Sequence, residues 1–285
     1  MRKLGRRQTA KWVSRLREFL PELAVQYPAI RPVWRRATII LHGSASTGVH
    51  DRWSDLDAWF WVPRRDLRRI DAASPTRFFE FTIDGRPGHA NADAREDILA
   101  SVRACHLELI HELRHAVVVQ DPGGFGRRMI ALARRRMRPT VRRRLFFHEY
   151  VEMRGEHRSL DNPLNRRDHA AVLFALGKTL SHALRAAMVL DGEPTPYDKW
   201  LVQAASKTPT GRLVARRVRH IVRFVGKGAL NLREGDARHP LNLEIRKIRA
   251  DLVAAAHRRG IKDGWLQKWW LWIDEARGAR EGVRW

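Results

Sequence analysis

The sequence predicts an α+β protein in which the strands come early and the helices dominate later. Short apolar or alternating segments, which are typical of strands, are confined to about the first 94 of its 285 residues. From residue 95 onward the apolar residues recur mostly at helical spacing, most clearly over 168–190. This order predicts an α+β domain over 1–125, followed by an all-helical C-terminal domain over 126–285.

The N-terminal domain is expected to begin with an amphipathic helix over 9–28, because apolar residues recur there every three or four positions. The elements expected after it are strands over 36–43 and 56–62, a polar stretch over 63–75, a strand over 78–83, a turn at 84–88 and a return strand over 89–94. In the return strand, alternation places Ala90 and Ala92 on one face and His89, Asn91 and Asp93 on the other.

The second part of the chain reads as a series of helices separated by Gly/Pro-containing loops. The expected helices cover 98–119 (ending in a short extended piece), a segment from about 125, 146–155, 168–190, 197–205, 213–225, 240–258 and 264–279. The single cysteine, Cys105, falls inside the first of these helices, and we interpret it as a small packing residue.

Composition narrows the possible environments and partners. The formal net charge of +24, carried mostly by arginine, is typical of a protein with a polyanionic partner, although a compositional bias toward arginine would produce the same charge. One cysteine excludes an internal disulfide and favours a reducing compartment. We find neither an apolar run of about 18 residues nor a signal peptide, so the sequence predicts a cytoplasmic protein without a membrane span.

The segment 39–62 holds the pattern with the clearest chemical meaning. An apolar run ends in Gly43-Ser44, and ten residues later Asp55-Leu56-Asp57 begins a second apolar run. Two carboxylates two positions apart on a strand point to the same face and suit Mg²⁺, which prefers oxygen ligands. A Gly-Ser turn allows the backbone to approach a phosphate closely. Together these features predict metal-assisted chemistry on a nucleoside triphosphate.

This arrangement resembles the signature of the polymerase-β-like nucleotidyltransferase superfamily. The resemblance implies a small mixed sheet with flanking helices, one or two Mg²⁺ ions held by Asp55 and Asp57, and a nucleoside triphosphate such as ATP held by Gly43 and Ser44. Family members usually add a third carboxylate from a neighbouring strand. Asp93 fits that role best, which makes Asp55, Asp57 and Asp93 the predicted catalytic and metal-binding residues, while Glu80 is the runner-up and Asn91 could occupy the position instead.

Two later segments are similar to bacterial aminoglycoside-type nucleotidyltransferases and their uncharacterised relatives. They are Val119–Phe125, with its Asp121-Pro122-x-Gly124 pattern, and Gly192–Leu201, which contains Pro196-Tyr197-x-Lys199. The resemblance implies that Lys199 faces the triphosphate or the acceptor; the alternative is an ordinary surface lysine. It also implies transfer of a nucleoside monophosphate, AMP from ATP in the first instance, to a hydroxyl of a small molecule or an RNA.

A second class of function remains open from sequence, namely a non-catalytic nucleic-acid-binding protein that retains the same fold. The arginines of 127–144 and those of 212–223 could contact phosphates along a nucleic acid, or could simply form solvated basic faces.

Overall fold

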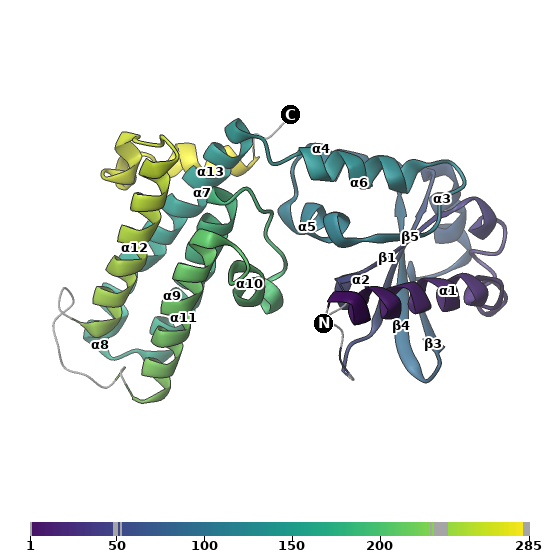
Figure 1. The fold of residues 1–285 in the computed structure, drawn as a ribbon, viewed down its shortest axis with the longest axis horizontal. Coiled ribbons are helices and arrows are strands. Elements are labelled where there is room, and N and C mark those ends of the chain that lie inside the picture. Colours follow the sequence, from purple (N-terminus) through teal and green to yellow (C-terminus); the bar gives the residue numbers. More distant parts are fainter. Residues whose placement is uncertain (1, 48–50, 52, 229, 231–238, 282–285) are drawn as a thin grey trace. The chain divides into compact units, whose positions relative to one another are not determined.

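The structure is a computed structural model that describes residues 2–47, 51, 53–228, 230 and 239–281. The chain separates into two compact units, Met1–Arg136 and Met137–Arg284 (Figure 1). The first contains a small mixed sheet with flanking helices and the second is helical, so the predicted α+β class is confirmed. The boundary expected after residue 125 falls at the start of α6 (Phe125–Arg135), a helix that belongs to the first unit.

The sheet of the first unit has five strands in the order β3-β4-β2-β1-β5. They are β1 (Thr38–His42), β2 (Leu56–Val62), β3 (Phe78–Ile83), β4 (Arg86–Ala94) and β5 (Val117–Gln120). Neighbouring strands run antiparallel except β2 and β4, which pair in parallel. That parallel pair requires a crossover connection, which α3 and β3 provide.

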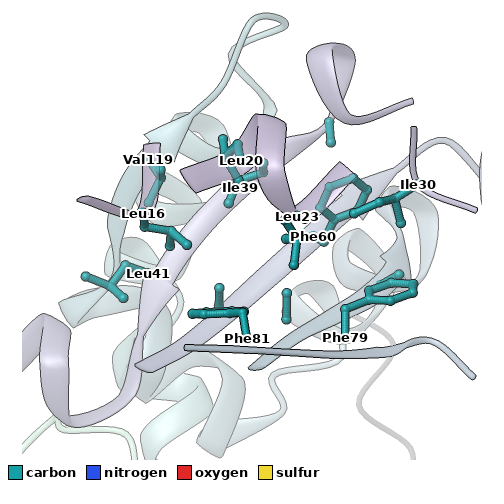
Figure 2. Packing of buried hydrophobic residues seen from close by; sticks show 14 of the residues in the cluster. Leu16, Leu20, Leu23, Ile30, Ile39, Leu41, Phe60, Phe79, Phe81 and Val119 are labelled. Carbon is teal, nitrogen blue, oxygen red and sulfur yellow. The ribbon is translucent and has the colours of Figure 1, made fainter. Parts of the chain in front are cut away.

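One face of the sheet packs against the long first helix, α1 (Arg2–Gln26). Leu16, Leu20 and Leu23 of this helix lie over apolar side chains of the strands, including Leu41 and Phe60 (Figure 2). The alternation expected for the return strand is confirmed, because Ala90 and Ala92 are buried in this core. The opposite sheet face therefore carries Asp57 and the polar residues of β4.

The remaining elements of the first unit are short: η1 (Trp34–Arg36), α2 (Gly43–Thr47), α3 (Arg64–Ala73), α4 (Arg95–Arg103) and α5 (Leu107–His115). Helix α3 lies in the polar stretch over 63–75, for which the sequence predicted no helix. The helix expected over 98–119 is instead two helices, α4 and α5. Cys105 lies between them and adopts a positive φ of 59°, which interrupts the helical conformation. Helix α6 packs on the second sheet face, where Phe125 meets Trp61 edge-on.

The second unit is built around α9 (His169–Leu190) and α7 (Pro139–Arg158), which pack together. The other elements are α8 (Asp161–Arg166), α10 (Asp198–Ala205), α11 (Pro209–Gly226), α12 (Pro240–Arg258), η3 (Gly264–Leu266), η4 (Trp269–Leu271) and α13 (Ile273–Glu281). The helix expected over 264–279 is thus two short 3₁₀ turns followed by α13.

Helix α9 is the one described helix whose length and apolar composition would suffice to cross a membrane. Half of it or more is buried within the protein, against α7, α10, α11 and α12. Its apolar character is therefore accounted for by its place in the core of the second unit.

Candidate metal and nucleotide site

The turn after β1 is shaped to receive the side chain of Asp57. In the antiparallel register of β1 and β2, His42 is paired with Asp57, and Gly43 follows with a positive φ of 68°. A Cβ atom on Gly43 would lie 2.2 Å from Oδ2 of Asp57, far inside van der Waals contact. Only glycine satisfies both the backbone conformation and this close approach. The Gly43 and Asp57 of the sequence motif are therefore in direct contact.

Asp55, Asp57 and His89 form a compact group of potential metal ligands. One ligand atom from each residue lies within 4.8 Å of the others. The Nε2 atom of His89 is 3.2 Å from Oδ1 of Asp57, and its Nδ1 atom is 3.9 Å from Oδ2 of Asp55. Asp55 precedes β2 and its side chain is 51% exposed, whereas those of Asp57 and His89 are about one-fifth exposed. A cation could thus enter from solvent on the Asp55 side.

The backbone N–H of Gly43 donates a hydrogen bond to Glu112 of α5, with 3.0 Å between N and Oε2. Nδ1 of His42 is 3.7 Å from the same carboxylate oxygen, and its ring stacks on Trp59 with 3.8 Å between centroids. Burial opposes ionisation of Glu112, but its contacts with His42 and the Gly43 N–H outweigh burial and lower its pKa. The N–H expected to hold a phosphate is therefore held by a carboxylate. Ser44 beside it is buried.

The structure places His89, rather than Asp93, beside Asp57. The parallel register of β2 and β4 pairs Asp57 with His89 and Trp61 with Asp93, four positions further along the strand. At about 3.3 Å per residue that is about 13 Å away. Burial raises the pKa of Asp93, while the charge of Arg77 opposes this effect. The group that contains Asp55 and Asp57 does not include Asp93.

The two alternatives to Asp93 also lie outside this group. Glu80 pairs with His89 across β3 and β4, so it lies on the same sheet face as His89 but one strand further from Asp57, with an exposed side chain. Asn91 pairs with Trp59 and lies between His89 and Asp93 along β4. The alternation along the sequence places His89 on the polar face of this strand, but it does not indicate that His89 could bind a metal.

Asp121 and Lys199 come from the two later sequence segments, and the structure shows the surroundings of each. Asp121 is buried and accepts hydrogen bonds from Thr38 and from the backbone N–H groups of Gly126 and Arg127, so it caps the start of α6. Lys199 is an exposed residue near the start of α10 in the second unit.

Comparison with known proteins gives distant structural similarity but no match at the level of sequence. No protein-family model matches the sequence, and no curated protein matches it. The structure resembles the crystal structure of a nucleotidyltransferase-like protein from Exiguobacterium sibiricum 255-15, with a TM-score of 0.44 and 10% sequence identity. The match covers 85% of this chain and 78% of that chain. Function must therefore be inferred from the residues of the site and not from this likeness.

Proposed function

We propose that this protein is a metal-dependent nucleotidyltransferase that transfers a nucleoside monophosphate from a nucleoside triphosphate to a hydroxyl acceptor. The observation that carries the proposal is the contact of Gly43 with Asp57, with Asp55 and His89 completing a group of metal ligands. We take ATP as the first donor to test, and a small molecule or an RNA as the acceptor. The two carboxylates suit Mg²⁺, the cation expected from sequence.

The residues around the site have distinct roles in this proposal. A bound divalent cation would neutralise charge on the triphosphate as pyrophosphate leaves. Asp55 and Asp57 would hold it, and Gly43 leaves the space that Asp57 needs. The turn Gly43-Ser44 would approach the phosphates. For the Gly43 N–H to bind a phosphate, Glu112 would have to release it; otherwise the neighbouring backbone N–H groups would bind the phosphates instead. Asp93 receives no role at this cation, because its register places it beside Trp61.

A direct assay tests the proposal with the full-length protein. Each labelled nucleoside triphosphate is incubated with Mg²⁺ or Mn²⁺ and with either total RNA or a panel of aminoglycosides, and label transfer is measured. Asp55→Asn and Asp57→Asn should each reduce transfer at least about a hundredfold, because each removes an anionic ligand and preserves the side-chain shape.

The matched control is Asp71→Asn, which removes an exposed carboxylate of α3 that pairs with Arg77 outside the site. It should retain transfer. Transfer that persists in both site variants would show that the reaction, if present, occurs elsewhere.

A second candidate function, binding of nucleic acid without catalysis, is favoured by helix α11. This helix contains five arginines and no acidic residue. Arg217 pairs with Asp251 and Glu244 of α12. Among the described residues, the other four have no acidic partner, and they repeat at helical spacing along one exposed face: Arg212, Arg216, Arg219 and Arg223. Such a row fits a polyanion, and salt-dependent RNA binding tests it.

A further inference from the structure

The third donor at the site is an imidazole, which changes the cation that the site should prefer. Mg²⁺ binds oxygen ligands in a near-ideal octahedron, whereas imidazole nitrogen favours first-row transition metals. A set of two carboxylates and one histidine therefore does not fit Mg²⁺ as well as three carboxylates would. Mn²⁺ accepts both carboxylate oxygen and imidazole nitrogen, and it also accepts phosphate oxygen.

The imidazole of His89 is held in place rather than free to turn away. Its ring stacks on Phe78 of β3, with 4.6 Å between centroids and an interplanar angle of 26°. Both ring nitrogens lie near a carboxylate, Nε2 near Asp57 and Nδ1 near Asp55. Either nitrogen is therefore close enough to a carboxylate to share a cation with it.

The other carboxylates of this sheet face are not in position to replace the imidazole. Glu80 is on the far side of His89, and Asp93 is four positions along β4. With a neutral imidazole, Asp55 and Asp57 supply two negative charges, which match one divalent cation. The absent Cβ of Gly43 shows that the backbone is built to let Asp57 into this position.

From these observations we propose that Asp55, Asp57 and His89 bind a single Mn²⁺ ion in preference to Mg²⁺, with His89 as the third protein ligand. The inference rests on the proposed function only for the role of the cation. Binding of the metal alone can be measured without nucleotide or acceptor.

Pulsed electron paramagnetic resonance on the full-length protein with Mn²⁺ tests the ligand directly. The wild type should show hyperfine coupling from one imidazole nitrogen, and His89→Ala should lose it. In titrations that follow the signal of free Mn²⁺, the wild type should bind Mn²⁺ at least about tenfold more tightly than Mg²⁺, the latter measured by competition. His89→Ala should weaken Mn²⁺ binding about tenfold or more and Mg²⁺ binding much less.

Two further variants make the result specific. His89→Asp should narrow the preference for Mn²⁺ over Mg²⁺, because it replaces nitrogen with oxygen at the same position. Glu80→Gln changes the β3 residue that pairs with His89 and should leave both affinities unchanged. No nitrogen coupling in the wild type, or equal loss of both cations in His89→Ala, would overturn the inference.

The experiments distinguish failure of the metal-site inference from failure of the proposed transferase function. Nitrogen coupling and Mn²⁺ preference without transfer of label would support the metal site and contradict the transferase. Transfer that proceeds with Mg²⁺ and is unaffected by His89→Ala would support the transferase and contradict His89 as a ligand. Loss of transfer in His89→Ala at unchanged Mn²⁺ affinity would also contradict it, and would indicate that His89 acts on the acceptor.

Discussion

At the scale of single residues, Gly43 sets the position of Asp57. Two separate effects act at this residue, the positive φ and the space next to the carboxylate. A side chain at positive φ costs about 1–2 kcal/mol in itself. The steric effect is additional, because Asp57 would have to move out of the way.

Gly43→Ala is therefore expected to lower the free energy of unfolding by about 1–3 kcal/mol and to weaken metal binding. Gly85→Ala is a matched control: Gly85 also has a positive φ, of 73°, but nothing lies within 4 Å of its missing Cβ. It should cost about 1 kcal/mol and leave metal binding unchanged. Urea denaturation and Mn²⁺ titration of both variants measure the two effects. Equal metal affinity in the two variants would show that Asp57 does not depend on Gly43.

Of the three residues that we propose as metal ligands, the sequence suggested Asp55 and Asp57 but not His89. Gly43 and Asp57 are brought together by the β1–β2 pair, which is formed by one short stretch of the chain. The partner of Asp57 on β4 depends on the register of a parallel pair, which no local pattern encodes. Period-two alternation made His89 and Asp93 equivalent, and the register separates them by four positions.

At the scale of elements, most helices and strands were predictable, and the failures have local causes. Strands β2 and β3 and helix α12 have the expected bounds. The break at Cys105 could not be predicted, since no glycine or proline marks the positive φ of this residue. Helix α3 was missed because its first turns are mainly charged, and its buried side is only Asp66, Leu67 and Ile70.

The contact between α7 and α12 makes the second unit sensitive to acid. Burial lowers the pKa of His157 from 6.5 to about 4, although its hydrogen bond to Asn242 acts in the opposite direction. Above pH 6.5 the imidazole is neutral in both the folded and the unfolded chain. Below it the unfolded chain takes up a proton that the folded one does not, so stability is lost as the pH falls from 6.5 toward 4.

His157→Gln should therefore reduce this loss, which amounts to at most about 3 kcal/mol for the wild type. Urea denaturation between pH 7.5 and pH 4.5 gives the free energy of unfolding of both proteins. The difference between the wild type and the variant should change with pH. His169→Gln, which removes an exposed histidine at the start of α9, is the control and should follow the wild type. A constant offset between wild type and His157→Gln at all pH values would contradict the proton linkage.

At the scale of the whole molecule, the arginines that produce most of the net charge of +24 differ in whether other groups of the protein already bind them. Several arginines of 127–144 are already engaged, such as Arg136 with a backbone carbonyl of α4 and Arg143 with Asp263. The row on α11 has only neutral partners among the described residues. It spans about 16 Å between Arg212 and Arg223. The basic surface expected from sequence over 127–144 is therefore partly paired, although Arg128, Arg134 and Arg135 remain exposed.

If α11 binds RNA, replacing its four exposed arginines with glutamine should flatten the dependence of log K on log[salt] by about 3, because each lost contact removes roughly 0.7–0.9. Fluorescence anisotropy with a labelled single-stranded RNA measures the slope. A control variant with the same change in charge replaces four other exposed arginines: Arg68, Arg128, Arg134 and Arg135. Equal flattening by both variants would indicate diffuse attraction rather than a site on α11.

The order of strands in the sheet has a consequence for synthesis of the chain. Strand β1 lies between β2 and β5, and β5 is separated from it by about 75 residues of sequence. The β1–β2 hairpin can form early, but one edge of β1 stays open until Val117–Gln120 has left the ribosome. During that interval the nascent chain presents an apolar edge strand, the kind of element most prone to pairing with another chain. Arg17 of α1 can form its hydrogen bonds to β5 only after that strand has been synthesised, because its guanidinium donates to the carbonyl of Val119.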